Sequence, residues 1–139
     1  MEHVLPAKML LTLLGKLEAE AGDGPPVCLA IVNSSGKLAA FLRMDGTPDR
    51  VISIAQSKAY TAMRMEISTQ SFRERLLREQ LATAEFCDPA FTSLEGGIPL
   101  FDAQGKCIGG LGISGRKTCD DHALATRLAN MLTAMHDAR

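Results

Sequence analysis

The chain has 139 residues, of which 46% are hydrophobic and 22% charged, and its formal net charge is −1. This composition is typical of a soluble globular protein, and we expect one domain spanning residues 1–139. The near-neutral charge, an aromatic content of 4% and the absence of tryptophan give no indication of a nucleic-acid partner. The chain starts without a basic leader, and its apolar run at 9–14 is too short to cross a bilayer. We therefore expect a cytoplasmic protein without a membrane partner.

Cysteine and histidine are common metal ligands, but their spacing here is not that of a metal site. His122 and His136 would lie about four turns apart on one helix, so they cannot share an ion within one chain. We therefore expect no metal site, and reduced thiols at all four cysteines. The cysteines occur singly, at Cys28, Cys87, Cys107 and Cys119.

The first half of the chain predicts a helix followed by a β-hairpin. Pro6 suits a first helical turn, and apolar periodicity continues from it to about residue 21. Apolar residues cover most of the circumference of this 6–21 helix, which indicates cover on more than one side and so an interface in a homo-oligomer. Strands are expected at 27–32 and 38–44, joined by the turn residues of 33–36.

A second helix is predicted from Pro48 to about residue 65, with Thr47 as its N-cap. Lys58 and Thr61 belong to a row at the edge of its buried face. The neighbouring row consists mainly of small side chains, which allow another backbone to approach closely. Its members are Val51, Ala55, Ala59 and Ala62.

The second half of the chain predicts two helices and three strands. A capping-box pattern at Ser71 and Glu74 predicts a short helix that ends at about residue 81. Thr118 with Asp121 predicts the start of a last helix. The strands expected between these helices are 91–94, 98–101 and 106–115.

The strand at 106–115 alternates glycine with apolar residues. Gly110 and Gly112 lie on one face, which therefore carries almost no side-chain bulk. Two explanations are open: a close-packed helix, for which the small-residue row is suited, or a flat ligand. The order of elements predicts an α/β (α+β) fold, with a central antiparallel sheet of about five strands and helices on both faces.

Five segments of the chain, followed by Asp121 and Ala125, occur in an order and spacing that match a known family. The segments are VNSSGKL at 32–38, AFLRMDG at 40–46, AQSKAYTA at 55–62, GGIP at 96–99 and IGGLGISG at 108–115. Together they resemble the GlcG/HbpS-like family, which includes the C-terminal domain of PduO-type adenosyltransferases. Asn33 departs from the aspartate usual in this family, and Ser35 departs from one of its turn glycines.

The resemblance implies a profilin-like fold and homo-oligomers. Some relatives bind haem, so it also implies haem or a related tetrapyrrole as a cofactor. Other relatives are encoded beside enzymes of glycolate or diol/glycerol catabolism. These implications leave the identity of the ligand open.

Candidate ligand-binding residues lie at strand ends and helix starts. Arg43 and Asp45 can face a ligand carboxylate, pair with each other, or organise a turn. Lys58 can hold a ligand carboxylate, or form an ion pair with Asp45 or Asp121. The full set is Arg43, Asp45, Lys58, Thr61, Gly97, Ser114, Gly115 and Asp121.

Three of these candidates lie close in sequence to the start of the last helix. Asp121 would point towards the sheet from its first turn, where the helix dipole alone explains an acidic residue. Backbone amides at Ser114 and Gly115 can hold an anion close to that helix start. Gly97 can line the same end of the sheet.

His122 and Met44 are the candidate ligands of a haem iron. No catalytic constellation is visible, so the preferred hypothesis is a small-molecule-binding protein for haem or a related tetrapyrrole. The first alternative is an enzyme acting on a small acid or aldehyde, with Lys58 and Asp121 as its acid/base groups. The second is an accessory protein of a diol/glycerol or glycolate catabolic enzyme, binding through the first helix or the charged face at 73–79.

Overall fold

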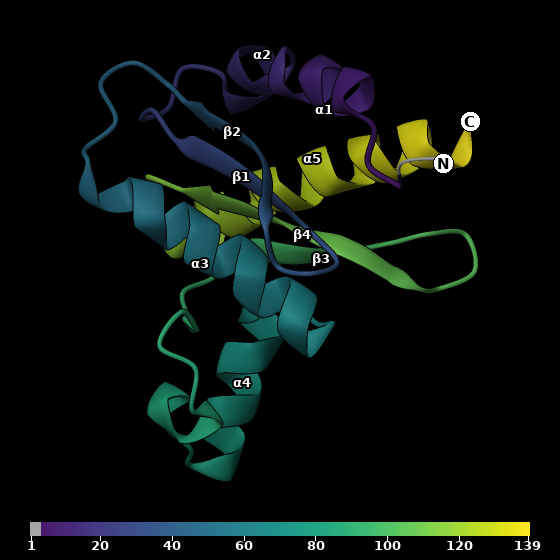
Figure 1. Ribbon diagram of the computed structural model, residues 1–139. Coiled ribbons are helices and arrows are strands. Elements are labelled where there is room, and N and C mark those ends of the chain that lie inside the picture. Colours follow the sequence, from purple (N-terminus) through teal and green to yellow (C-terminus); the bar gives the residue numbers. More distant parts are fainter. Residues whose placement is uncertain (1–3) are drawn as a thin grey trace.

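The computed structural model describes residues 4–139. In that part, the chain forms five α-helices, one short 3-10 helix and four strands (Figure 1). The helices are α1 (Ala7–Leu14), α2 (Leu17–Ala21), α3 (Arg50–Met65), α4 (Thr69–Glu79), η1 (Thr83–Phe86) and α5 (Thr118–Asp137). The strands are β1 (Cys28–Asn33), β2 (Leu38–Arg43), β3 (Gly97–Phe101) and β4 (Cys107–Ser114).

The four strands form one antiparallel sheet in the order β2-β1-β4-β3. Strands β1 and β4 lie in the centre and are buried along almost their whole length. The expected strand at 91–94 is wrong, and the count of about five becomes four within residues 4–139. The backbone N–H of Thr92 donates to the hydroxyl oxygen of Thr61 at 3.0 Å. A side chain of α3, and not a neighbouring strand, therefore fixes this segment.

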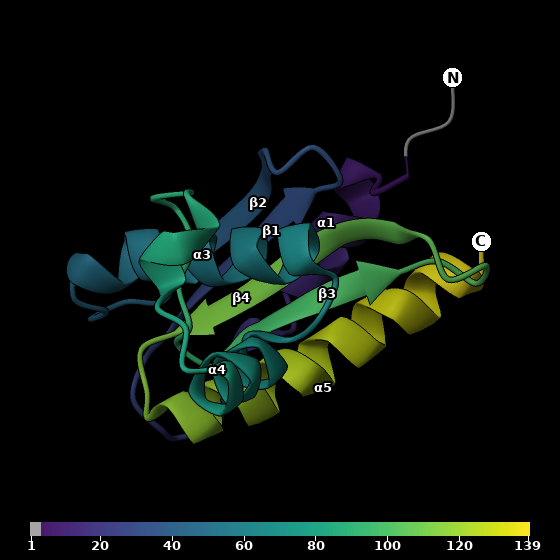
Figure 2. The ribbon, with the colours of Figure 1, turned by 90° about the horizontal axis from the view of Figure 1, so that it is seen from below.

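Helices cover both faces of the sheet (Figures 1 and 2). Helices α1, α2 and α5 lie on one face and α3 lies on the other, with α4 extending away from the end of α3. The larger apolar core lies on the first face and includes Leu13 and Leu128. The smaller core lies under α3 and includes Ala55 and Ala59. The architecture is a mixed α/β fold with an antiparallel sheet, as predicted.

The glycine face of β4 is explained by the packing of α3. A Cβ atom on Gly110 would run into the carbonyl oxygen of Ala59, and one on Gly112 would run into that of Ala55. No side chain fits between the two elements, so their backbones are in direct contact. Close helix packing therefore accounts for this face without a flat ligand.

Several element boundaries differ from the sequence prediction. The predicted 6–21 helix is two helices, because the helix is interrupted at Gly15. Thr47 is buried and donates its hydroxyl to a carbonyl oxygen of the preceding turn, so it does not cap α3. Helix α4 begins two residues before the predicted Ser71, because Ser68 Oγ accepts the Ser71 N–H at 3.0 Å.

Candidate functional site

The residues predicted to bind a ligand lie near one end of the sheet but in two kinds of surroundings. The strand register places Arg43 and Ser114 in one row, on either side of Cys28. Arg43 and Asp45 are exposed at the sheet edge and Met44 between them is half-buried, whereas Ser114 is buried. The remaining predicted residues lie at the junction of α3, the β3–β4 pair and the start of α5: Lys58, Thr61, Gly97, Gly115, Asp121 and His122.

Lys58 and Asp121 form an ion pair in the interior. Lys58 Nζ lies 3.0 Å from Asp121 Oδ2 and donates to the carbonyl oxygen of Ile113 at 2.8 Å. The two side chains are 1% and 2% exposed. A Cβ on Gly96 would lie 2.9 Å from Nζ, so the neighbouring backbone packs directly against the pair. The expected ion pair of Lys58 is confirmed, with Asp121 as its partner.

Burial acts against the charged form of both partners. It lowers the pKa of the Lys58 ammonium group, an effect that the Asp121 carboxylate opposes. Burial also raises the pKa of Asp121, and Lys58 and the backbone N–H groups of Arg116 and Gly115 oppose that shift. The Arg116 N–H donates to Asp121 Oδ1 at 3.0 Å. The amides at this helix start therefore bind an anion that belongs to the chain itself, the Asp121 carboxylate.

Thr61 and Gly97 hold irregular parts of the chain in place. Thr61 Oγ1 accepts the Thr92 N–H, and the Gly97 N–H donates to Thr69 Oγ1 at 2.9 Å. A Cβ on Gly97 would run into the carbonyl oxygen of Lys58. These contacts connect the segment before β3 to α3 and α4. They occupy polar atoms of Thr61 and Gly97, two residues that were predicted to bind a ligand.

At the exposed end of β2, Arg43 pairs with Asp49. Arg43 Nη2 lies 2.7 Å from Asp49 Oδ1 and donates to the Thr47 carbonyl oxygen at 2.5 Å. The side chains of Arg43 and Asp49 are 41% and 91% exposed, so water screens the pair. The alternative in which Arg43 pairs with Asp45 is wrong.

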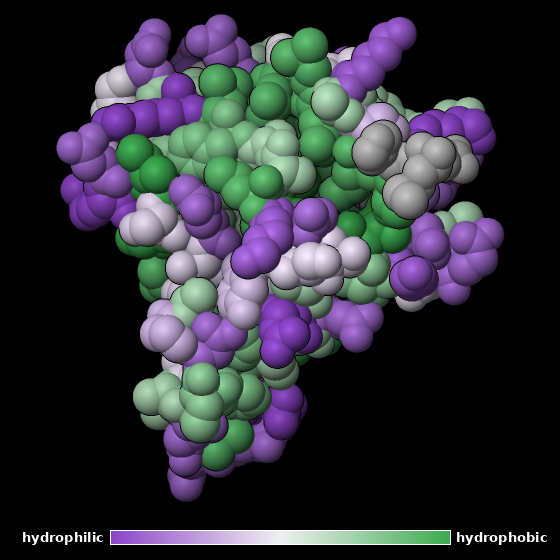
Figure 3. All heavy atoms as spheres, viewed as in Figure 1, coloured by the Kyte–Doolittle hydropathy of each residue, from purple (hydrophilic) through white to green (hydrophobic). Residues whose placement is uncertain are grey.

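Arg43, Met44 and Asp45 line a pocket of about 290 Å³ between β2 and the α1–α2 turn. Leu14 lines this pocket and also a second one, of about 430 Å³, between α1 and β2. We call the two together the α1–β2 groove. The second pocket is apolar apart from Lys8, and Figure 3 shows apolar side chains gathered over α1 and β2. The Arg43 pocket is also lined by the carboxylates of Glu18 and Asp45, so the groove combines an apolar part beside Lys8 with a part of mixed charge.

His122 is the fifth residue of α5, next to the buried Asp121. Its Nδ1 atom is shielded from solvent and has no hydrogen-bond partner among residues 4–139. An unpartnered ring nitrogen is available to a metal or to a hydrogen-bond donor. His122 does not line the α1–β2 groove, where Met44, the other candidate iron ligand, lies.

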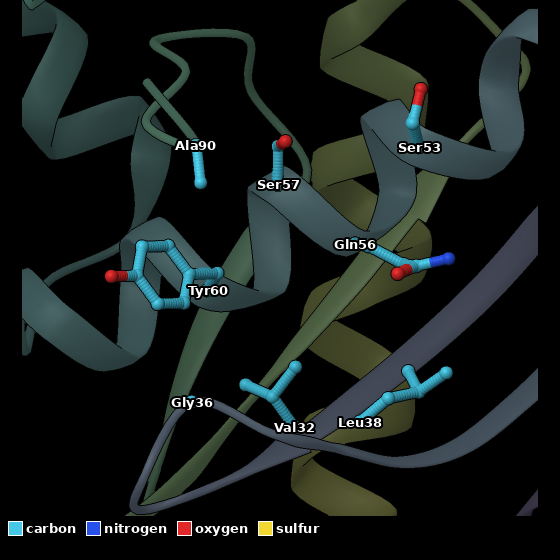
Figure 4. Close-up of a pocket in the computed structure, with 8 residues that line it drawn as sticks. All are labelled: Val32, Gly36, Leu38, Ser53, Gln56, Ser57, Tyr60 and Ala90. Carbon is cyan, nitrogen blue, oxygen red and sulfur yellow. The ribbon is translucent and has the colours of Figure 1, made fainter. Parts of the chain in front are cut away.

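A further pocket, of about 400 Å³, lies between α3 and the β1–β2 hairpin (Figure 4). Sequence reasoning missed it, because it followed only the buried rows of α3. The available signal was a stripe of polar side chains spaced three and four residues apart, which share one helix face. They are Ser53, Gln56, Ser57 and Tyr60.

Residues 4–139 contain neither a metal-binding cluster nor a helix that could span a membrane. Within residues 4–139, no three histidine, cysteine, aspartate or glutamate side chains lie close enough to hold a metal ion. No helix in that range has the length and apolar content that crossing a membrane requires. All four cysteines are free thiols, and Cys28 is buried.

Comparison with known proteins gives consistent matches along the chain. The family model described as haem degrading protein HbpS-like matches residues 5–130. Protein GlcG of Escherichia coli K12 is 34% identical over 100 residues, which are 72% of this chain and 72% of GlcG. The structure of HbpS (27% identity, TM-score 0.81) covers 95% of this chain and 92% of its own. The match to PduOC in complex with haem (25% identity, TM-score 0.80) covers 91% of this chain and 93% of PduOC. The chain therefore belongs to the HbpS-like family.

Proposed function

We propose that the chain binds haem or a related tetrapyrrole in the α1–β2 groove. The observation that carries this proposal is the similarity to PduOC, which extends over 91% of the chain and whose structure is a complex with haem. Membership of the HbpS-like family supports a haem-related role. When bound, haem would supply an iron centre for ligand binding or electron transfer.

The groove has the chemistry that a haem ring requires. Its apolar lining includes Leu10, Leu14 and Ala40, which suit the macrocycle, and its volume lies in the range of small-molecule sites. Lys8 and Arg43 line different parts of the groove and offer cations to the two propionates, although Glu18 and Asp45 line the same pocket as Arg43. Because the ion pair of Arg43 is exposed and screened, its guanidinium can exchange partners at little cost.

Two side chains compete as the iron ligand. The thioether of Met44 lines the groove together with Arg43, and a thioether is an established haem ligand. His122 offers an unpartnered Nδ1 atom but lies outside the groove lining. We favour Met44 because it shares one pocket with a cation for the propionates.

In this proposal, Lys58 and Asp121 stabilise the fold and do not contact the ligand. An enzyme that used them as acid/base groups would need one of them to reach a substrate. Both are buried and bonded to each other, which favours the binding function over the enzyme. The accessory-protein alternative stays a prediction, and co-purification with the product of a neighbouring gene tests it.

We infer that the same face also joins copies of the chain. Strand β2 is an edge of the sheet, and every residue from Leu38 to Leu42 is apolar. Leu38 is 50% exposed and Leu11 on α1 is 69% exposed. An exposed apolar edge strand favours association with another chain, and a second copy over β2 would also enclose the groove. Light scattering should give a mass above that of one chain. Leu11→Glu should lower this mass, whereas the control Leu77→Glu, at an equally exposed leucine, should not.

Titration of the purified chain with haemin tests the haem proposal. The wild-type chain should give a saturable shift of the Soret band. Met44→Ala should change the position of the bound Soret band, because the iron loses a ligand. Arg43→Ala should weaken binding about 10-fold, through the loss of one charge-assisted hydrogen bond. The matched control is Arg75→Ala on α4, whose arginine side chain is 38% exposed and also forms an ion pair, and this variant should bind like the wild type.

The variants also separate the two candidate ligands. If His122→Ala changes the bound spectrum and Met44→Ala does not, the iron ligand is His122 and the groove assignment is wrong. The lack of a saturable Soret shift in the wild-type chain would contradict haem binding itself.

A further inference from the structure

The pocket between α3 and the β1–β2 hairpin is separate from the α1–β2 groove and shares none of its lining residues. Its polar lining is the α3 stripe, which consists of Ser53, Gln56, Ser57 and Tyr60. Figure 4 shows this stripe between Val32 and Leu38 of the hairpin on one side and Ala90 on the other. Three segments distant in sequence therefore form one concave site.

The fold does not use most of this stripe. The side chains of Ser53, Gln56 and Ser57 have no hydrogen-bond partner within residues 4–139. Gln56 and Ser57 are nevertheless half-buried. Their polar atoms are open to water inside a pocket bounded by the hairpin. A ligand that enters the pocket can use this free hydrogen-bonding capacity.

Tyr60 forms a fixed wall of the pocket. Its hydroxyl donates to Asp88 Oδ2 at 2.5 Å, and its ring meets that of Phe91 edge-on. In Figure 4 the hydroxyl is directed away from the other labelled residues. Gly36 lies against the same ring, where a Cβ would be 2.8 Å from the ring carbon Cε1. The ring is therefore held from outside the pocket, and glycine at position 36 lets the hairpin turn pack directly against it.

The chemistry of the lining selects the class of ligand. None of the eight lining residues is charged, so a carboxylate or an ammonium ligand would find no counter-charge. Hydroxyl and carboxamide groups both donate and accept, which matches a ligand whose own polar groups do both. The side chains of Val32 and Leu38 and the Tyr60 ring add apolar surface.

We propose that this pocket binds a neutral, hydroxyl-rich ring compound of the size of a monosaccharide. Its hydroxyl groups bond to Gln56 and Ser57, and its C–H face lies against the apolar side. The volume of about 400 Å³ is within the range of small-molecule sites. This site is independent of haem, because no residue of it belongs to the groove.

An NMR titration of the isotope-labelled chain tests the proposal, with D-glucose and D-galactose as neutral probes. At least one sugar should give saturable shifts confined to amides of α3 and the hairpin, with a Kd of about 1–10 mM for so few contacts. The charged ring analogues glucuronate and glucosamine should bind more weakly. Gln56→Ala and Ser57→Ala should each weaken binding about 10-fold. Gln104→Ala, an exposed glutamine in the β3–β4 turn, is the matched control.

A variant that fills the pocket provides an independent test. Ala90→Leu removes no polar group but occupies the pocket, so it should abolish sugar binding. Haemin titration of the same variants should match the wild type, which separates this site from the groove. The proposal is overturned if neither sugar gives a saturable shift, if glucuronate binds equally well, or if Gln56→Ala and Ser57→Ala both keep wild-type affinity.

Discussion

The two ion pairs among the predicted site residues have similar geometry and opposite surroundings. Lys58 and Asp121 lie 3.0 Å apart, and Arg43 and Asp49 lie 2.7 Å apart. The side chains of the first pair are almost completely buried, whereas those of the second are open to water. A buried pair that loses one partner leaves an unpaired charge in the interior, but an exposed pair is screened and contributes little.

The difference in burial separates a charge that stabilises the fold, on Lys58, from a charge that a ligand can reach, on Arg43. Lys58 has fixed acceptors on two other elements, Ile113 of β4 and Asp121 of α5, so it joins α3 to both. Arg43 is bonded only to the turn that follows it, at residues 47 and 49. A ligand can therefore take the place of a partner of Arg43 without disturbing the core.

Removal of one partner of the buried pair should have the largest effect on stability. Lys58→Met leaves the Asp121 carboxylate unpaired in the interior. We expect it to lower the free energy of unfolding by about 3–5 kcal/mol. Urea denaturation followed by circular dichroism measures this loss.

The double variant Lys58→Met/Asp121→Asn separates charge from packing. Both side chains are then neutral and close to the original volumes, and asparagine still accepts the Arg116 N–H that the carboxylate accepts now. We expect the double variant to recover more than half of the lost stability. A double variant as unstable as Lys58→Met would show that packing, and not the charge balance, sets the loss.

Two glycines extend the comparison to the backbone. Gly96 (φ 129°) lies beside the buried pair, and Gly46 (φ 85°) lies in the turn between Arg43 and Asp49 of the exposed pair. A Cβ at position 96 would meet the Ile113 carbonyl oxygen and Lys58 Nζ, whereas one at position 46 would meet only Pro26, at 3.8 Å.

Substitution of each glycine by alanine should therefore differ in cost. Gly96→Ala should lower the free energy of unfolding by about 3 kcal/mol, from backbone strain and overpacking together. Gly46→Ala should lower it by about 1 kcal/mol, from strain alone. Chemical denaturation of both variants checks this, and equal losses would argue against a tightly packed surrounding of the buried pair.

Local patterns in the sequence predict most of the fold. The hairpin, the glycine strand and the helices follow from periods of two and 3.6 residues, which neighbouring residues set. The contact of Ala55 and Ala59 with β4 was predictable, because small residues occur on both sides. The strand at 91–94 was wrong, because Thr92 is bonded to Thr61, 31 residues away. Local sequence periodicity carries no information on a contact between residues so far apart in the chain.

The choice of charge partners could not be predicted from the sequence. Lys58 had two candidate acids, Asp45 and Asp121, and the outcome depends on which elements end at the same place. The start of α5 returns to the end of β4, so Asp121 reaches Lys58 although they are 63 residues apart. The partner of Arg43 was missed because residues 48 and 49 were assigned to a helix that begins only at Arg50.

Tyr60 and Asp88 form a hydrogen-bonded pair of intermediate exposure. The hydrogen bond raises the pKa of Tyr60 and lowers the pKa of Asp88. The contribution of Tyr60 to folding stability is therefore complete below pH 10.0, the ordinary pKa of tyrosine. It is lost as the pH rises through the higher folded-state pKa. The contribution of Asp88 is present above its ordinary pKa of 3.8 and is lost as the pH falls through the lower folded-state value.

The titration of Tyr60 can be followed directly, because it is the single tyrosine of a chain without tryptophan. Ultraviolet absorbance of the phenolate should give a midpoint above pH 10.0 in the wild type. Asp88→Asn should move this midpoint back towards the ordinary value, because a neutral acceptor does not disfavour the phenolate as a carboxylate does. Identical midpoints in the two proteins would contradict the hydrogen bond between Tyr60 and Asp88.

Breaking the exposed pair should have the smallest effect on stability. Asp49→Ala removes a screened carboxylate and should lower the free energy of unfolding by about 0–0.5 kcal/mol. Arg43→Ala also removes the donor to the Thr47 carbonyl, so it should cost about 1 kcal/mol. In about 1 M NaCl, where the Debye length is about 3 Å, the loss in Asp49→Ala should disappear and the loss in Lys58→Met should persist. A salt-sensitive loss in Lys58→Met would overturn the contrast between the pairs, because ions screen only those charges that the fold leaves open to water.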